Sequence, residues 1–112
     1  MDSKKYGVLI TPFVRETLIE IENYTVIHFS SNAGKAKVET ILKKIEAIAV
    51  FPEIGVSADE KFGVQVDKKY FTRCVPADRD YLILYFVDEL QKLIVITHLL
   101  PTKTDYLRLF GK

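Results

Sequence analysis

The basic side chains in the second half of the chain are the residues whose chemistry points most directly to a function. They are Lys68, Lys69, Arg73, Arg79 and Lys103, with Asp67, Asp78, Asp80 and Asp105 interspersed among them. Lysine and arginine bind phosphate through charge-assisted hydrogen bonds, so the cluster favours a phosphate or nucleic-acid contact. The net charge of the whole chain is only +1, whereas a protein that follows a nucleic-acid backbone is usually more basic. We therefore expect any such contact to be local.

Histidine and cysteine offer little for catalysis or metal binding. His98 lies in an apolar run and His28 in a helical pattern, where a hydrogen-bonded structural histidine is commoner than a general base. Cys74 lies in a predicted strand, where a small buried thiol is commoner than a nucleophile. These residues are widely spaced, without a Cys-x-x-Cys or His-x-x-x-His pair. We expect no metal site and no cofactor.

Length and composition predict one globular domain over residues 1–112. A chain of 112 residues can bury a single core, and it contains no low-complexity tract or repeat. Its single cysteine excludes an internal disulfide and fits a reducing compartment. The apolar run near the N-terminus is too short for a signal peptide, and the uncharged run over residues 93–102 is too short to span a bilayer. We expect a cytoplasmic protein without membrane contact.

The first half of the sequence predicts a strand followed by a helical hairpin. Residues 5–10 form a short apolar strand pattern, and Thr11-Pro12 is typical of a helix start, with threonine as the cap. Apolar residues about three apart predict a helix over residues 13–29, and a second helix follows the connection at 30–34 and ends at Pro52. Two helices joined this briefly should pack antiparallel. We expect residues 57–61 to form a loop.

The second half predicts three strands, over residues 70–75, 81–87 and 93–99, with a turn at 76–78 and a hairpin connection at 88–92. The last two runs are almost continuously apolar, so both of their faces should be covered. The helical hairpin can cover one face, and we expect the other to be left for a partner. The fold class is therefore α+β, with an N-terminal strand, a helical hairpin packed on a small antiparallel sheet and a short C-terminal helical turn.

Several features together resemble the RelE/ParE superfamily over nearly the whole chain. They are the order of the elements, the Phe51-Pro52-x-x-Gly55 sequence, the aromatic strand over residues 81–87 followed by Asp88-Glu89, and the tail Thr102-Lys103-Thr104-Asp105-Tyr106-Leu107. The resemblance implies a toxin of a bacterial type II toxin–antitoxin system that arrests growth. It also implies a cognate antitoxin as partner, whose amphipathic helix or strand covers an apolar groove.

The resemblance implies two alternative targets. Family RNases cut messenger RNA on the ribosome, while ParE-type members poison DNA gyrase. An RNase needs a base, a cation that stabilises the phosphorane charge and an acid for the leaving oxygen. Our first hypothesis is an endoribonuclease in which Arg73 stabilises phosphate charge and Tyr106 or Arg79 assists proton transfer. The RNA phosphates would be bound by Lys103, Lys68 and Lys69.

The tail departs from the pattern of the RNases. Many relatives carry His-Gly-Arg-Arg-Asp-Tyr where this chain has Pro101-Thr102-Lys103-Thr104-Asp105-Tyr106, so the histidine and both arginines are missing. Gyrase inhibition is a close alternative. A third is a binding module that keeps the fold without catalysis, and the incomplete tail supports this third hypothesis. Ordinary roles also stay open, such as a surface ion pair for Arg73 and an aromatic anchor for Tyr106.

Overall fold

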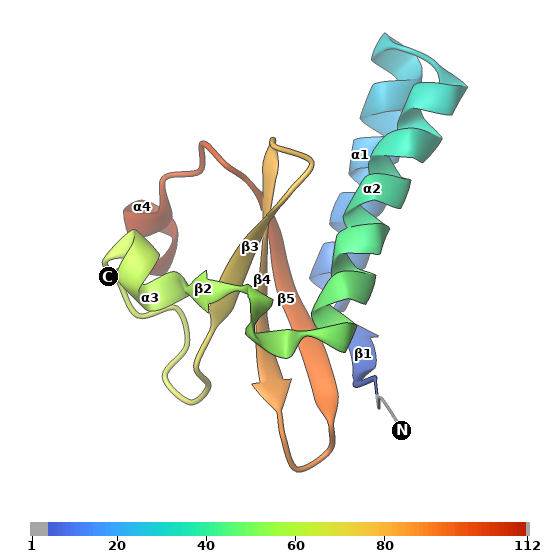
Figure 1. The fold of residues 1–112 in the computed structure, drawn as a ribbon. Helices are drawn as coiled ribbons and strands as arrows, with labels where there is room; N and C mark the ends of the chain where they lie inside the picture. The colour runs from blue at the N-terminus through green and yellow to red at the C-terminus, as the bar shows by residue number, and fades with distance from the viewer. Residues whose placement is uncertain (1–4, 112) are drawn as a thin grey trace.

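The computed structural model describes residues 5–111 and has one sheet with a long helical hairpin beside one face and two short helices beside the other (Figure 1). The elements in chain order are β1 (Gly7–Ile10), α1 (Pro12–His28), α2 (Ser31–Val50), the 3-10 turn η1 (Pro52–Ile54), β2 (Val56–Ser57), α3 (Ala58–Phe62), β3 (Arg73–Ala77), β4 (Tyr81–Asp88), β5 (Leu93–Pro101) and α4 (Tyr106–Phe110). The α+β class is confirmed, with the N-terminal strand, the helical hairpin and the C-terminal turn all present. Residues 1–4 and 112 of the predicted domain lie outside the described range.

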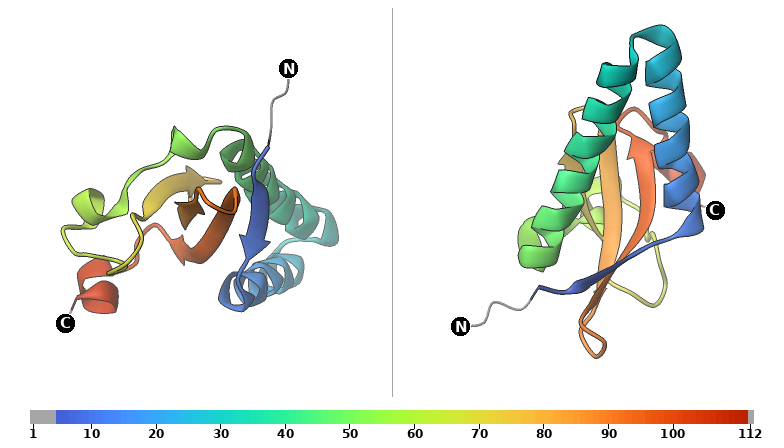
Figure 2. Two further views of the ribbon diagram at one scale, coloured as in Figure 1. Left: turned by 90° about the horizontal axis from the view of Figure 1, so that it is seen from below. Right: turned by 90° about the vertical axis from the view of Figure 1, so that its right-hand side faces the viewer.

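The sheet has the strand order β1-β5-β4-β3-β2. Neighbouring strands from β2 to β5 are antiparallel, whereas β1 runs parallel to β5, so β1 makes the sheet mixed. Figure 2 shows β1 at one edge, beside the lower end of the helical hairpin. The predicted hairpin connection at 88–92 is confirmed, because β4 ends at Asp88 and β5 begins at Leu93.

Polar side chains fix where the two helices of the hairpin begin. Ser30 accepts a hydrogen bond from the Ala33 amide, so α2 begins at Ser31, inside the predicted connection. The predicted helix start is confirmed, since α1 begins at Pro12 with Thr11 as its N-cap residue. The Thr11 hydroxyl does not cap the helix, however: it donates to the carbonyl of Ile96 at 2.9 Å and ties the start of α1 to β5. Gly34 lets the two helices approach, since a Cβ there would lie 2.7 Å from Cγ2 of Val26.

The main core lies between the helical hairpin and the sheet. Its fully buried members come from both layers and include Val14, Ile41 and Ile48 from the helices and Ile83, Tyr85, Ile94 and Ile96 from the strands. Removing these side chains from water is the main source of stability for a domain of this size. Helix α1 contacts mainly α2 and β5, and this packing fixes the hairpin over one face of the sheet.

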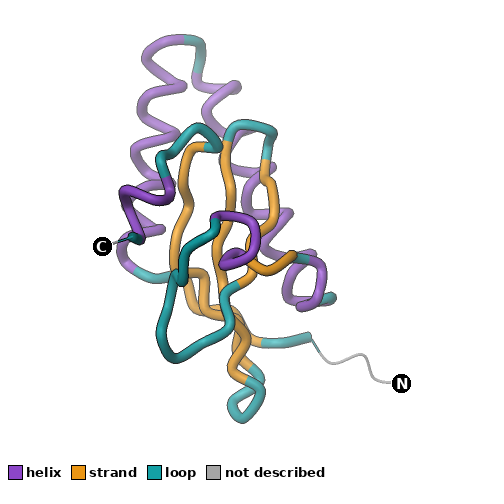
Figure 3. The backbone as a smooth tube through the Cα atoms, turned by 90° about the vertical axis from the view of Figure 1, so that its left-hand side faces the viewer, coloured by secondary structure: helices purple, strands orange, loops and turns teal. Residues whose placement is uncertain are grey.

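The opposite face of the sheet is also covered, which corrects two expectations. Residues 57–61 are not a loop: Ser57 caps α3 by accepting from the Glu60 amide, and Ala58 is fully buried. Helices α3 and α4 both lie on this face (Figure 3). Their side chains, with Phe62 among them, pack over a second cluster formed by Ala58, Cys74, Leu82, Leu84 and Leu100. This face is therefore closed by the chain itself rather than left for a partner.

The predicted turn at 76–78 is wrong as well, because β3 continues through Pro76 to Ala77. Because proline has no N–H to donate to a neighbouring strand, it is usually found at the edges of sheets. Strand β2 pairs only with Arg73 and Cys74, so β3 is an edge strand at Pro76 and needs no donor on that side. The turn lies instead at residues 78–80.

The buried hydroxyl of Tyr85 joins the end of the helical hairpin to the sheet. It donates to the carbonyl of Pro52 at 2.7 Å and accepts from the amide of Gly55 at 2.9 Å. Burial raises the pKa of Tyr85, so the phenol stays protonated and keeps both bonds. Gly55 is required here because a Cβ would lie 2.7 Å from the hydroxyl oxygen and 2.9 Å from the carbonyl oxygen of Cys74.

Substitution of this glycine tests the junction. Gly55→Ala should lower the free energy of unfolding by about 1–3 kcal/mol, because the methyl group displaces the Tyr85 hydroxyl. Gly7→Ala is the matched control, since a Cβ at Gly7 meets its nearest atom at an ordinary 3.4 Å. Urea denaturation measures both. Equal losses in the two variants would contradict the proposed role of the close contact.

Candidate functional site

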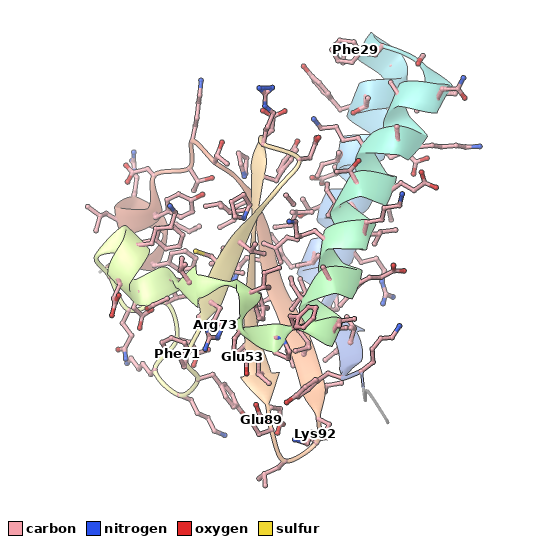
Figure 4. All side chains as sticks on the ribbon, in the orientation of Figure 1. Phe29, Glu53, Phe71, Arg73, Glu89 and Lys92 are labelled. Atoms are coloured by element: carbon pink, nitrogen blue, oxygen red, sulfur yellow. The ribbon has the colours of Figure 1, made fainter. Side chains whose placement is uncertain are left out.

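Arg73 lies where η1 meets the sheet. Nη1 of Arg73 donates to the carbonyl of Gly55 at 2.7 Å, and the guanidinium lies over the ring of Phe71, 5.0 Å from its centre. Figure 4 shows Arg73 near Phe71 and Glu53 at the lower part of the molecule. A pocket of about 200 Å³ surrounds the side chain and is lined by Pro52, Glu53, Phe71, Arg73, Val87 and Glu89. Two carboxylates thus line the same pocket as the guanidinium.

Tyr106 is built into the turn that begins α4. Its hydroxyl donates to the carbonyl of Pro101 at 2.9 Å, and Thr104 donates to the same oxygen from its hydroxyl and from its amide. The ring stacks on Phe62 with a centroid distance of 3.9 Å. Burial raises the pKa of the Tyr106 phenol. Asp105 then caps α4 by accepting from the amide of Arg108. The tail motif therefore forms a compact hydrogen-bonded turn.

Arg79 lies at the tip of the β3–β4 turn. Asp78 and Arg79 have φ of 53° and 59°, in the left-handed region. That conformation costs about 1–2 kcal/mol for a residue with a Cβ. Lys37 of α2 holds the turn, with Nζ 2.6 Å from Oδ2 of Asp78 and 3.0 Å from Oδ2 of Asp80. Its hydrogen bond to Asp78 raises the pKa of Lys37.

Lys103 lies beside this turn. The amide of Thr102 donates to the carbonyl of Asp80 at 2.9 Å, which joins the β5–α4 loop to the β3–β4 turn. A groove of about 590 Å³ lies between this corner and the far end of the helical hairpin. Its lining residues are Tyr24, Thr25, Phe29, Ala33, Lys37, Asp80, Tyr81, Pro101, Thr102 and Lys103. We call it the hairpin groove.

Lys68 and Lys69 are exposed in the loop between α3 and β3. The side chain of Asp67 accepts from the amides of Lys69 and Tyr70, and these two bonds lower the pKa of Asp67. Nζ of Lys69 lies 5.2 Å from the centre of the Tyr70 ring, and that ring stacks on Phe86. The two lysines are thus carried by a separate loop on the face covered by α3 and α4.

The six predicted site residues do not converge. Arg73 begins β3 and Arg79 follows its end, so the length of that strand, about 13 Å at 3.3 Å per residue, separates them. Arg79 and Lys103 share one corner, while Lys68 and Lys69 belong to the α3–β3 loop. Lys37, which holds that corner, was missed by the sequence analysis. No local sequence signal marks the contact of Lys37 with a turn that comes much later in the chain.

His98 is half-buried between aromatic rings. It makes edge contacts with Phe13 at 5.7 Å and with Phe110 at 5.2 Å between ring centres, and Nδ1 lies 2.9 Å from Oγ1 of Thr97. Burial lowers the pKa of His98. Within residues 5–111, no group of three or more His, Cys, Asp or Glu side chains is placed to hold a metal ion.

Comparison with known proteins identifies the family. The model of the ParE toxin of the parDE type II toxin–antitoxin system matches residues 8–106. The chain belongs to the ParE toxin family. A solved structure described as the chromosomal ParDE toxin–antitoxin system from P. aeruginosa has the same fold, with a TM-score of 0.69 and 13% identity, over 88% of this chain and 98% of that one. No curated protein matches the sequence.

Family membership confirms the resemblance to the RelE/ParE superfamily. The protein is the toxin component of a ParDE type II toxin–antitoxin system, and its partner is an antitoxin. Among the helices of residues 5–111, none has the length and apolar composition needed to cross a membrane. The target of the toxin and the roles of the six residues remain predictions.

A conservative substitution separates the two roles considered for Tyr106. Tyr106→Phe keeps the ring on Phe62 and removes one of the donors to the Pro101 carbonyl. We expect a loss of about 1 kcal/mol in the free energy of unfolding and an undiminished growth arrest. A general acid would instead lose about 10²–10⁴-fold in activity. Denaturation curves and growth after induction of each variant, with Tyr106→Ala to remove the stacking as well, measure the difference.

Burial of His98 predicts that the stability of the protein depends on pH. Because the folded state holds the pKa of His98 below its unfolded value of about 6.5, the unfolded chain binds the proton more readily in that window. The unfolding free energy should therefore fall as pH drops below about 6.5, until the folded-state pKa is passed.

His98→Gln should remove this part of the pH profile. His28→Gln, at the exposed end of α1, controls for the loss of an imidazole. Chemical denaturation at three pH values about one unit apart, near 7.5, 6.5 and 5.5, gives the dependence of the unfolding free energy on pH. An identical profile in wild type and His98→Gln would count against the assignment.

Proposed function

We propose that this toxin arrests growth by inhibiting DNA gyrase, the activity that the ParE branch of the resemblance implies. The observation that carries the proposal is the separation of the groups that an RNase would need. Arg73 lies at one end of β3, while Arg79 and Lys103 lie at the other. A reaction that moves protons at one phosphate requires its acid, base and cation within about 3 Å of the reacting atoms.

The surroundings of Arg73 also suit a structural role. One N–H of its guanidinium is bound to the Gly55 carbonyl, and Glu53 and Glu89 line the same pocket. A phosphorane carries extra negative charge, which two nearby carboxylates would oppose. The Tyr106 proton is likewise engaged by the Pro101 carbonyl. Both residues therefore support the fold in this proposal.

Inhibition of gyrase needs a protein-binding surface rather than a converging acid and base. The far end of the helical hairpin provides exposed apolar and aromatic side chains, since Tyr24 is 61%, Ile27 is 77% and Phe29 is 73% exposed. Aromatic residues are enriched in protein interfaces. The balanced charge of the chain also fits a protein target better than a bare nucleic acid.

Two assays with purified components test the proposal. The gyrase holoenzyme, relaxed plasmid and ATP measure supercoiling, and ribosomes with a defined messenger RNA measure cleavage by primer extension. We expect the toxin to inhibit supercoiling, the antitoxin to relieve the inhibition and the messenger RNA to stay intact. Cleavage of the messenger RNA without an effect on gyrase would support the RNase hypothesis instead. No effect in either assay and no growth arrest would support the binding module.

Arg73 gives a separate prediction. Arg73→Gln should lower the free energy of unfolding by about 1–3 kcal/mol, because the partly buried Gly55 carbonyl loses a charged donor. Gyrase inhibition per folded molecule should stay at the wild-type level. Arg108→Gln, at an exposed position of α4, is the control for the loss of an arginine. A folded Arg73→Gln protein without inhibitory activity would show that the arginine acts in function directly.

A further inference from the structure

The β3–β4 turn holds an arginine in an unfavourable backbone conformation. Asp78 and Arg79 are consecutive residues with positive φ, where glycine and asparagine are usual. Aspartate tolerates the left-handed region because its short side chain can bond locally, but arginine has no such compensation. Strained residues of this kind concentrate at functional positions, where the surrounding structure maintains them.

The surrounding structure fixes this turn from two sides. Lys37 reaches across from α2 and pairs with both Asp78 and Asp80. The amide of Thr102 holds the Asp80 carbonyl from the β5–α4 loop. Both aspartates that flank Arg79 therefore form ion pairs with Lys37.

The guanidinium of Arg79 is left free by this arrangement. Arg79 is exposed, and its side chain forms no hydrogen bond or ion pair with any residue from 5 to 111. It lies next to the hairpin groove, whose lining includes Tyr24, Phe29 and Tyr81. A planar guanidinium with five donors is suited to bidentate binding of a carboxylate.

We propose that Arg79 is a target-contacting residue, presented by the strained turn to a carboxylate of the protein target, and that Lys37 positions it. The inference rests on the proposed function, with gyrase as the protein that supplies the carboxylate. A protein carboxylate fits this corner better than a nucleic-acid phosphate. The net charge of the chain is only +1, which does not favour a polyanion, and the aromatic groove beside Arg79 accepts the apolar neighbours of an acidic residue.

The test uses the opposite effects of one substitution on stability and on activity. Arg79→Gly removes the strain and should raise the thermal midpoint by about 4–8 °C. The same substitution should weaken inhibition of gyrase supercoiling by about tenfold or more, because it removes a charge-assisted contact. Arg79→Lys keeps the charge without the planar fork and should fall between wild type and Arg79→Gly.

Lys92 offers a matched control. It is also a non-glycine residue with positive φ, at 53°, but it lies in the β4–β5 hairpin. Lys92→Gly relieves the same kind of strain at a site remote from the hairpin groove and should leave inhibition unchanged. Equal inhibition by wild type and Arg79→Gly would overturn the proposal, as would equal losses in Arg79→Gly and Lys92→Gly.

The positioning role of Lys37 requires a double-mutant cycle. Lys37→Gln should weaken inhibition in the wild-type background and have no further effect in the Arg79→Gly background, because it acts through the arginine. Additive losses in inhibition would overturn this role.

Two further measurements separate the alternatives. Binding of linear duplex DNA by the toxin alone, lost in Arg79→Gly, would show that the ligand is phosphate and would overturn the carboxylate assignment. A wild-type toxin without effect on gyrase defeats the proposed function itself, whereas an inhibitory wild type with an equally inhibitory Arg79→Gly defeats only this inference.

Discussion

The hydrogen bonds of the Tyr85 hydroxyl determine how the two layers of this toxin meet. The chain leaves α2 and must enter the sheet within a few residues, at Pro52–Gly55, where backbone groups would otherwise be buried without partners. Tyr85 satisfies one donor and one acceptor of this segment, and Arg73 satisfies the Gly55 carbonyl. An unpaired buried group costs more than a typical hydrogen bond contributes. These three contacts therefore make the junction specific.

The hydrogen bonds of this junction also determine which basic side chains are left to bind a target. Arg73 is used at the junction, at the start of β3, in a pocket shared with two glutamates. Arg79 follows the opposite end of β3, and Lys103 lies near it on the β5–α4 loop, beside the hairpin groove. Lys37 neutralises the two aspartates on either side of Arg79. At one end of the sheet the arginine is bound to the backbone, whereas at the other end the arginine is exposed to solvent. Such a division suits a toxin that binds a protein surface better than one that cleaves a phosphodiester bond.

The long elements were predictable because their apolar patterns are long. Both helices and the strands β4 and β5 follow from residue spacing alone, and their order led to the RelE/ParE resemblance that the family match confirms. Helix α3 was missed although its signal was present: Ser57 is followed three residues later by Glu60, the pattern of a capping box, and Gly63 closes the helix in the left-handed conformation. The turn predicted at 76–78 begins with a proline, which has no N–H for a neighbouring strand, but β2 is too short to need a donor at that position.

The candidate site was less accessible to sequence reasoning, for a physical reason. Residue types reveal which side chains can bind phosphate or donate a proton, but not which of them the fold brings together. The contact of Lys37 with Asp78 and the left-handed backbone of Arg79 depend on how α2 crosses the sheet. The partners of Arg73 and Tyr106 are backbone carbonyls, which every residue carries, so no sequence pattern marks them.

Pulse labelling after induction of the toxin in growing cells tests the central claim most directly. Thymidine and methionine incorporation are followed together, with and without the antitoxin. If the toxin acts on gyrase, DNA synthesis stops first and protein synthesis declines later. An immediate stop of protein synthesis while DNA synthesis continues would contradict the account.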